Sequence, residues 1–438
     1  MNLDSLRTVA ELCRRYRSYR ASQHWDRKRI EAHQDARLVR IIRHAAAHVP
    51  YYRSLFREIG LDVERFRGRA DLHRIPSLDK QTLRTRQKEF IADNARRFGI
   101  HWESTSGSTG TPLHLIIDRS SQANKLASVL RSYQWGGYRP GKRIFSIQSY
   151  TFSGTNALYK RFPLVNMWRF NSRELTRETG REVLRMLDDL RPEVLIGYPF
   201  AISMLSKIAA EEKIVIRPVQ SIVTAGETLS LRRRALLEQN FQCRVFDFYS
   251  HHENVAVISE CEQQQKHLCE DFAYNEILDE EGRPAERTGE GELVGTGLYN
   301  FAMPLIRYRT GDRVVLHDKE RICRCGRPLR CVSEIVGRQN DYIETPEGKL
   351  IGNVLEHSVD HAKGLILSQC VQDAIDHIYF NLVVDESFEP ASGEAIEAGV
   401  RKRLGDRIRI DLRRVDELER SKSGKTPFVL SKIGREYV

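Results

Sequence analysis

The chain has 438 residues, of which 40% are hydrophobic, and its 70 Lys and Arg residues against 59 Asp and Glu residues give a formal net charge of +11. This length and composition exclude a disordered protein or a collagen-like fibre and predict two domains, three at most. The positive charge favours anionic partners, from nucleotides to nucleic acid. No stretch approaches the roughly 20 apolar residues of a membrane span, and the charged amino terminus is unlike a secretory signal. We therefore expect a cytoplasmic protein without a membrane span.

The first 75 residues are predicted to be helical. Leu38, Ile41, Ile42 and Ala45 recur at the spacing of one helix face, and Pro50 is expected to end that helix. The dipeptide Asp79-Lys80 is expected to begin another helix shortly afterwards.

From Glu103 onward, short apolar runs alternate with helical segments, at 143–147, 194–197 and 221–224. Such alternation predicts a largely parallel sheet of the α/β class. Past Asp341, a strand over 378–384, a helix over 394–404 and a strand over 408–412 predict a small carboxy-terminal domain. We expect an α/β protein with a helical part at 1–75, a large domain with mainly parallel sheets at 76–337, and a small, mobile α+β lid at 338–438.

A loop rich in hydroxyl groups and glycine follows Glu103, and apolar residues flank it on its carboxy-terminal side. Glycines let the backbone approach a ligand closely, and hydroxyl groups donate hydrogen bonds to phosphate oxygens. The alternative is an ordinary flexible Ser/Gly loop, but the apolar flank favours a binding loop between strands. The predicted polyphosphate ligands are Ser104, Thr105, Ser106, Gly107, Ser108, Thr109 and Gly110.

This loop resembles the phosphate loop of the adenylate-forming superfamily, which contains the acyl-CoA synthetases. Further segments match motifs of that superfamily in the required order, and the similarity to the phenylacetate-CoA ligase and capsular-polysaccharide branch covers most of the chain. These segments are Thr224 to Leu229, Phe246 to Glu253, Tyr308 to Asp312, Gly337 to Asp341 and Arg420 to Lys425.

The resemblance implies a role for particular residues. Lys425 would carry positive charge to the reacting carboxylate and α-phosphate, and Glu253 would hold Mg²⁺. Asp312 would accept hydrogen bonds from the ribose hydroxyls. The other nucleotide ligands it implies are Ala225, Gly226, Glu227, Phe248, Tyr249, which would stack on adenine, and Arg338, at the swivel between the domains.

The chain departs from the family at Ser250, His251 and His252, where relatives carry Gly and small or polar residues. The two imidazoles could contact phosphate or the acyl carboxylate, narrow the acyl pocket, or mark weakened activity. We give His252 a candidate catalytic role. Candidates for binding the acyl group, by resemblance, are Tyr150, Gly197, Tyr198 and Pro199, for which core packing is the alternative.

The resemblance thus implies an AMP-forming ligase that uses ATP and Mg²⁺ to activate a small carboxylic acid, with CoA as the acceptor. One alternative keeps the adenylation and transfers the acyl group to an amine or hydroxyl of a sugar or carrier protein. Another is a basic zinc protein that binds nucleic acid, but no nucleic-acid motif appears, so no nucleic-acid partner is expected.

Cysteines and one histidine form a candidate metal site: Cys261, His267, Cys323 and Cys325. Thiolates and an imidazole make a closed tetrahedral set for structural Zn²⁺. Cys269 and Cys331 are competing ligands, and buried thiols without a metal are the alternative.

Overall fold

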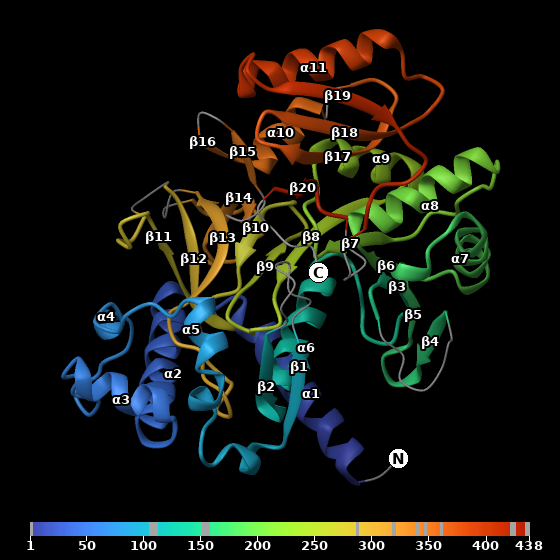
Figure 1. Ribbon diagram of the computed structural model, residues 1–438. Coiled ribbons are helices and arrows are strands. Elements are labelled where there is room, and N and C mark those ends of the chain that lie inside the picture. Colours follow the sequence, from blue (N-terminus) through green and yellow to red (C-terminus); the bar gives the residue numbers. More distant parts are fainter. Residues whose placement is uncertain are drawn as a thin grey trace. The chain divides into compact units, whose positions relative to one another are not determined.

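The computed structural model describes residues 3–104, 113–150, 158–285, 289–317, 321–338, 342–345, 348–359, 362–420 and 426–433. Contacts within the chain group it into two compact units. The first comprises Met1–Gly107, Thr111–Trp135 and Phe248–Val336, and the second comprises Ser108–Gly110, Gly136–Asp247 and Gly337–Val438. Figure 1 labels the helices and strands of both units. The predicted division at 75/76 and 337/338 remains a prediction.

The first unit begins with helices. Asp26 caps the second of them by accepting a hydrogen bond from the backbone of Arg29. The predicted face of this helix is buried, and the helix ends just before Pro50, as expected. Pro50 also opens the next helix. Asp79 caps the predicted helix that follows. The elements are α1 (Leu3–Ser22), α2 (Arg27–His48), α3 (Pro50–Glu58), α4 (Arg69–Leu72), α5 (Lys80–Thr85), η1 (Gln87–Phe90), η2 (Ala95–Phe98) and α6 (Arg119–Trp135).

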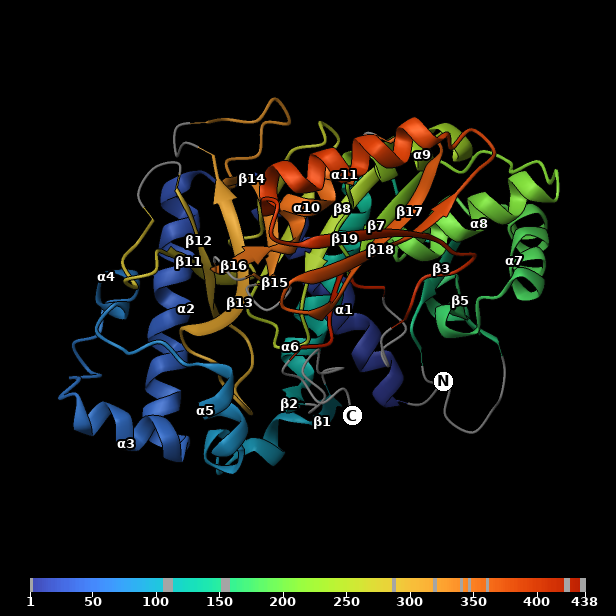
Figure 2. The ribbon, with the colours of Figure 1, turned by 45° about the horizontal axis from the view of Figure 1, so that its top comes forward.

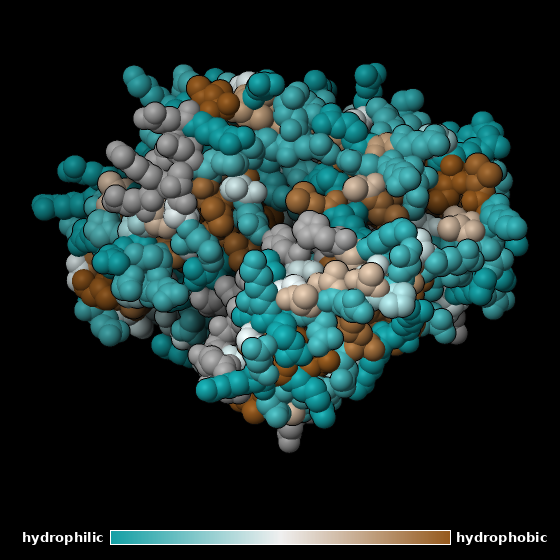
Figure 3. All heavy atoms as spheres, turned by 90° about the horizontal axis from the view of Figure 1, so that it is seen from above, coloured by the Kyte–Doolittle hydropathy of each residue, from teal (hydrophilic) through white to brown (hydrophobic). Residues whose placement is uncertain are grey.

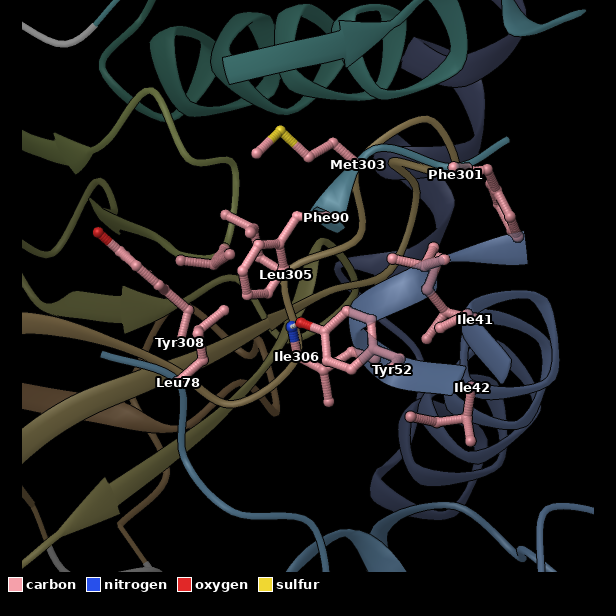
Figure 4. Packing of buried hydrophobic residues seen from close by; sticks show 14 of the residues in the cluster. Ile41, Ile42, Tyr52, Leu78, Phe90, Phe301, Met303, Leu305, Ile306 and Tyr308 are labelled. Atoms are coloured by element: carbon pink, nitrogen blue, oxygen red, sulfur yellow. Dashed lines mark hydrogen bonds between the residues drawn. The ribbon is translucent and has the colours of Figure 1, made fainter. Parts of the chain in front are cut away.

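Apolar side chains from these helices pack against a later segment of the same unit. Ile41, Ile42, Phe90 and Leu305 lie in this cluster and are almost fully buried (Figure 4). The Tyr52 hydroxyl accepts a hydrogen bond of 3.0 Å from the backbone N–H of Ile306, so the buried tyrosine satisfies a backbone donor that would otherwise be unpaired. The helical part and the segment before β13 therefore share one core.

The strands of the first unit pair mainly in antiparallel fashion. The hairpin β1–β2 stands apart, and the neighbour order of the others is β11-β12-β13-β14-β10-β9-β8. The pairs β8–β9, β9–β10, β10–β14, β11–β12 and β12–β13 are antiparallel. The strands are β1 (Ile100–Ser104), β2 (His114–Asp118), β8 (Arg244–Ser250), β9 (Val257–Glu260), β10 (Lys266–Leu268), β11 (Ala273–Leu278), β12 (Glu290–Gly297), β13 (Tyr308–Leu316) and β14 (Cys331–Arg338).

The second unit contains the predicted parallel strands. The neighbour order is β7-β6-β3-β5-β4, and the pairs β3–β5, β3–β6 and β6–β7 are parallel. Strands β3, β6 and β7 are buried on both faces, which explains their continuous apolar runs. The elements are β3 (Ile144–Gln148), β4 (Tyr159–Phe162), η3 (Pro163–Val165), β5 (Met167–Asn171), η4 (Ser172–Glu174), α7 (Arg177–Leu190), β6 (Val194–Gly197), α8 (Pro199–Glu211), β7 (Ser221–Ala225) and α9 (Leu231–Phe241).

The carboxy-terminal part of the second unit has a sheet of order β19-β18-β17-β20 with helices α10 and α11 packed against each other (Figure 2). The predicted strand–helix–strand succession is present as β18, α11 and β19, and the two strands are parallel. The elements are β15 (Tyr342–Thr345), β16 (Gly348–Ile351), α10 (Gly352–Val359), β17 (Leu365–Ala374), β18 (His377–Val384), α11 (Pro390–Leu404), β19 (Arg409–Arg414) and β20 (Val429–Ser431).

The fold class predicted from the sequence, α/β with a carboxy-terminal sheet domain, is confirmed. No helix among the described residues is both long and apolar enough to cross a membrane. In the face shown in Figure 3, hydrophilic residues predominate and hydrophobic residues form separate small patches. Such scattered patches are normal for a folded protein and do not indicate a partner.

Candidate active site

The hydroxyl-rich loop connects two paired strands. Ser104 is the last residue of β1 and pairs with His114, the first residue of β2. The loop is therefore bounded by strands, as expected, and its ends lie side by side. The other predicted phosphate ligands, from Thr105 to Gly110, lie outside the described residues.

Asp312 lies at an irregularity of β13. The register of the β12–β13 pair shifts there, and Gly311 adopts a φ of +77°. The Thr310 hydroxyl donates to the Leu293 carbonyl at 2.7 Å and accepts from the Asp312 backbone N–H at 3.1 Å. The Glu292 carboxylate accepts a hydrogen bond from the Gly311 N–H at 3.1 Å. These hydrogen bonds fix the backbone conformation at Asp312.

Tyr249 and Asp312 come from different strands and meet directly. The Tyr249 hydroxyl donates to Asp312 Oδ2 at 2.7 Å, and it also lies 2.6 Å from His251 Nε2. The Tyr249 and His251 rings meet edge to face, with their centroids 5.0 Å apart. The structure therefore brings together the residue predicted to stack on adenine and the residue predicted to bind ribose. The contact with His251 helps to orient the Tyr249 hydroxyl toward Asp312.

Glu253 lies in the turn after β8. Its Oε1 accepts a hydrogen bond of 3.3 Å from the Tyr308 hydroxyl. Burial alone would raise the pKa of Glu253, but nearby charge, that of His251 first, holds the pKa below its usual range. The carboxylate is therefore ionised at neutral pH, as a Mg²⁺ ligand must be.

Two charged residues of this site were missed by the sequence analysis. The Lys125 ammonium, on α6, donates a hydrogen bond to the His251 carbonyl. Burial lowers the pKa of Lys125, while the charges of Glu103 and Glu253 oppose that shift. Nothing in the sequence distinguishes this lysine from other helical lysines. Glu103 could have been noticed, since it is an acidic residue in a strand directly before the hydroxyl-rich loop.

Glu103 joins two imidazoles. His101 Nε2 lies 3.2 Å from Glu103 Oε1, and His252 Nδ1 lies 3.2 Å from Glu103 Oε2. His252, the predicted candidate for catalysis, thus contacts the strand that leads into the hydroxyl-rich loop. The His252 side chain is 59% exposed, which leaves it accessible to a ligand.

Phe248 precedes Tyr249 and lies on the opposite face of the same strand. Its side chain is buried against Tyr133, with ring centroids 6.0 Å apart. A role for Phe248 in binding a nucleotide remains a prediction, and its side chain packs in the interior.

In the second unit, the predicted adenine segment follows β7. Ala225 ends that strand and Gly226 has a φ of +81°, so the chain turns sharply there. The Glu227 carboxylate accepts two backbone hydrogen bonds, from Phe200 at 3.0 Å and from Thr426 at 2.9 Å. Glu227 therefore links the start of α8 to the residue that follows Lys425.

The predicted acyl-binding residues also lie in the second unit. Gly197 ends β6, and Tyr198 and Pro199 begin α8. A Cβ atom at Gly197 would lie 2.9 Å from the Ile147 carbonyl oxygen, so the close approach of β3 requires glycine. Burial raises the pKa of Tyr198 to about 12, which keeps its phenol neutral. The Tyr150 hydroxyl lies 2.8 Å from the Ser146 hydroxyl.

Two other predicted residues have no described side chain. Arg338 is the last residue of β14, and only its backbone is described. Lys425 lies outside the described residues, between Arg420 and Thr426, which are both placed. Their roles remain predictions.

The predicted metal ligands Cys261, His267, Cys323 and Cys325 lie together in the first unit, with all four ligand atoms within 4.8 Å of one another. Cys261 Sγ lies 3.7 Å from Cys323 Sγ, and Cys325 Sγ lies 3.4 Å from His267 Nε2. Tetrahedral zinc with its usual bond lengths separates such ligand atoms by about 3.5 to 3.8 Å. These two separations are close to those of a zinc site.

The surroundings of His267 favour the same conclusion. His267 Nδ1 lies 3.2 Å from the Leu329 carbonyl, which accepts its proton and leaves Nε2 free to face the thiols. The competing Cys331 lies on the Nδ1 side, with its Sγ 3.9 Å from that atom. Hydrogen bonds from Cys261 and His267 hold the pKa of Cys325 well below its usual range, against the effect of burial.

Comparisons with known proteins extend over most of the chain. A phenylacetate-coenzyme A ligase of Thermus thermophilus is 30% identical over 328 residues, which cover 72% of each chain. Protein CapK of Staphylococcus aureus is 22% identical over 379 residues, covering 83% of this chain and 81% of its own. The family model of the CapK C-terminal domain matches residues 343–432.

A solved structure has the same fold. The crystal structure of 2-hydroxyisobutyryl-CoA ligase in the postadenylation state, in complex with R3-HIB-AMP, matches with a TM-score of 0.77 at 20% identity. The match covers 94% of this chain and 91% of that one. The resemblance stated from the motifs is confirmed. The chain therefore belongs to the phenylacetate-CoA ligase family of adenylate-forming enzymes.

Proposed function

We propose that the protein joins a carboxylic acid to CoA through an acyl-adenylate. The relatives include phenylacetate-CoA ligases, and the shared fold is that of acyl-CoA ligases. These findings favour an AMP-forming acid–thiol ligase over transfer to a sugar or carrier and over nucleic-acid binding. The observation that carries the proposal is the 2.7 Å hydrogen bond between Tyr249 and Asp312, because it joins two predicted nucleotide ligands from separate strands.

In the first step, a carboxylate oxygen of the acid attacks the α-phosphorus of ATP. A new bond forms between that oxygen and phosphorus, the bond to the β-phosphate breaks, and pyrophosphate leaves with its electron pair. Asp312 would hold the ribose and Tyr249 the adenine. Glu253 would bind the Mg²⁺ that neutralises the phosphates, and Lys425 would offset the charge of the two reacting anions. The protein mainly positions charges in this step.

In the second step, the CoA thiolate attacks the acyl carbon of the adenylate. The carbon–sulfur bond forms, the carbon–oxygen bond to AMP breaks, and AMP leaves with its phosphate oxygen. A nearby positive charge would stabilise the reacting thiolate in this step, as it would stabilise the two anions in the first step. The basic net charge of the chain favours the approach of the anionic CoA.

Acid-dependent exchange of labelled pyrophosphate into ATP tests the first step. We expect exchange with at least one acid from a panel that includes phenylacetate and 2-hydroxyisobutyrate, followed by thioester formation when CoA is added. Lys425→Ala should abolish exchange. Lys402→Ala, which removes another lysine of the same domain from α11, should retain it. Absence of exchange with every acid, or equal exchange in both variants, would contradict the proposal.

We also propose that Cys261, His267, Cys323 and Cys325 bind one structural Zn²⁺. The ligand separations and the orientation of His267 support this. The bound ion would fix the β9–β10 turn to the loop before β14, so metal binding and folding would be coupled. Metal analysis of the purified protein should find about one zinc per chain, and removal by a chelator should lower the unfolding temperature. A folded, metal-free protein of unchanged stability would contradict the proposal.

Two further aspects belong to the same proposal. The segment 338–438 would act as the small domain that carries Lys425, and the enzyme would act in the cytoplasm, where ATP and CoA are available. A fluorescent-protein fusion that is found outside the cytoplasm would contradict the second aspect.

A further inference from the structure

The predicted acyl-binding residues lie at the carboxyl ends of parallel strands in the second unit. Tyr150 follows β3, and Gly197 ends β6, which pairs with β3. The Tyr198 phenol has a hydrogen bond with the backbone of Ser149, the residue before Tyr150. In open α/β sheets, ligands bind outside the carboxyl ends of the strands. The two tyrosines therefore lie together where a ligand is expected.

Polar residues of β3 and β5 hold Tyr150 in place. Its hydroxyl lies 2.8 Å from the Ser146 hydroxyl and donates to Gln148 Oε1 at 2.9 Å. Its backbone N–H donates to Asn171 Oδ1 at 3.3 Å. Ser146 and Gln148 share one face of β3, and the opposite face lies in the apolar cluster with α7 and α8. One face of this part of the sheet is therefore polar next to the predicted acyl site.

Arg169 lies on the same polar face, beside Tyr150. It is the register partner of Ser146 in the parallel pair β3–β5, so the two side chains share a face. Its guanidinium carbon lies 4.9 Å from the centre of the Tyr150 ring and 4.5 Å from that of Phe162. Burial raises the pKa of Tyr150, and the positive charge of Arg169 opposes this rise. Contact with the two rings orients the guanidinium of Arg169 next to the predicted acyl-binding phenol.

A second positive charge lies next to Arg169 on the neighbouring strand β4 (Figure 1). Lys160 is the cross-strand partner of Arg169, and its ammonium lies 5.9 Å from the centre of the Phe162 ring. Like charges directly opposite each other are unfavourable. Neither side chain forms a salt bridge with a carboxylate in the part of the chain that the structure describes, and residues 151–157 contain no Asp or Glu. An anion bound here would offset the repulsion.

We propose that the acid activated by this protein carries a second carboxylate, which Arg169 binds with the help of the Lys160 charge. This inference rests on the proposed function and on the predicted role of Tyr150 in binding the acyl group. A carboxylate suits the position because a guanidinium presents paired N–H donors to its two oxygens. The Arg169 Nε already donates to Met167 Sδ at 3.2 Å, a weak acceptor. Arg169 thus determines specificity for a dicarboxylic acid over a monocarboxylic one.

The test compares matched acids in pyrophosphate exchange: phenylacetate with para-phenylenediacetate, and pentanoate with glutarate. In wild type, at least one dicarboxylate should exceed its partner in kcat/KM by about tenfold to a hundredfold, the effect of charge-assisted hydrogen bonds. Arg169→Met should remove this preference and change kcat/KM for the monocarboxylates by less than about threefold. A higher KM for ATP or CoA with an unchanged preference among the acids would assign Arg169 to a phosphate group and overturn the inference.

Arg161→Met is the matched control, because it removes the same charge from the opposite face of β4. The Arg161 guanidinium carbon lies 4.9 Å from the centre of the Trp168 ring, so this arginine also contacts an aromatic side chain. The control should keep the preference for the dicarboxylate, and an equal loss in both variants would overturn the inference. Arg169→Gln replaces Arg169→Met if near-ultraviolet circular dichroism shows that the latter does not fold.

Reversal of the charge gives a second, positive result. Arg169→Glu should favour para-aminomethylphenylacetate over para-phenylenediacetate, because the new carboxylate attracts the ammonium group and repels the second carboxylate. A merely structural role of Arg169 would not produce this exchange of preference. An unchanged order of the two acids would contradict a contact between residue 169 and the acid.

Titration calorimetry with the full chain provides a readout that does not depend on adenylation. Wild type should bind at least one dicarboxylate about tenfold or more tightly than its monocarboxylate partner, and Arg169→Met should bind the two equally. If no acid supports pyrophosphate exchange, the proposed function fails, and calorimetry still decides the role of Arg169. Equal wild-type affinities within both pairs, or binding of no acid at all, would overturn the inference.

Discussion

Changing Glu103 to Gln removes a negative charge from β1, directly before the hydroxyl-rich loop, and keeps the size of the side chain. The carboxylate lies 3.2 Å from both His101 Nε2 and His252 Nδ1. Burial alone would raise the pKa of Glu103. The hydrogen bond to His252, the charge of Lys125 and the hydrogen bond to His101 outweigh burial and lower the pKa from 4.5 to about 2.

This pKa change sets the size of the expected effect. A fall from 4.5 to about 2 corresponds to about 3.4 kcal/mol of folding free energy. The Glu103 side chain is 27% exposed, so we halve this value for solvent screening and expect about 1.7 kcal/mol at pH 7. Because the folded-state pKa is the lower one, the stabilisation is complete well above pH 4.5 and is lost as the pH falls toward 2. About 0.7 kcal/mol should remain at pH 3.

Urea unfolding of wild type and Glu103→Gln at pH 7, 5 and 3 measures this contribution. The difference in unfolding free energy should be similar at pH 7 and 5 and smaller at pH 3. Glu89→Gln is the matched control, because Glu89 pairs with Arg86 on the surface and its loss should have little effect. A difference below about 0.5 kcal/mol at pH 7, or one that grows in acid, would refute the reasoning about this network.

Two other substitutions test buried contacts of the first unit. Tyr249→Phe removes the hydroxyl that binds Asp312 and His251. The KM for ATP in pyrophosphate exchange should therefore rise about twofold to tenfold, and the unfolding free energy should be nearly unchanged. An unaltered KM would contradict the role of the hydroxyl. Asp271→Ala leaves Arg131, which is 0% exposed, without its 2.5 Å carboxylate partner, and should lower the unfolding free energy in urea by about 3 to 5 kcal/mol. A loss below about 1 kcal/mol would mean that water or another group replaces the carboxylate.

Elements with one periodic apolar face could be predicted from the sequence. The buried face of α2 and the succession β18, α11 and β19 repeat at the period of their element. The parallel strands β3, β6 and β7 could be predicted for another reason, because each is a short, continuous apolar run. The antiparallel strands of the first unit gave no such signal. β10 spans only Lys266–Leu268, which is too short for a period to appear. It pairs with β9, which precedes it closely, and with β14, which lies far along the chain.

Some residues of the candidate site could likewise be predicted from the sequence, and others could not. Tyr249 and Asp312 lie in recognisable motifs. Near Asp312, Thr310 and Gly311 shape the backbone by hydrogen bonds, so this motif in the sequence also predicts local geometry. Lys125 lies in the middle of a helix, and its importance comes from the segments that fold against it. A single charged residue in a helix has no local signature, because its partners are chosen by the tertiary structure.

The contacts that hold the residues on either side of Lys425 have no sequence signature. Arg420, Gln369 and Glu227 bind backbone atoms of residues 172–175, 419, 426, 427 and 200. Every residue offers a carbonyl and all except proline offer an N–H, so the partner positions can vary in side chain without losing the bond. Only the path of the chain has to be kept, here by η4, by β17 paired with β20, and by the first turn of α8. The motif around Lys425 predicts the reacting group, whereas the backbone contacts of Arg420 and Glu227 hold the residues on either side of it.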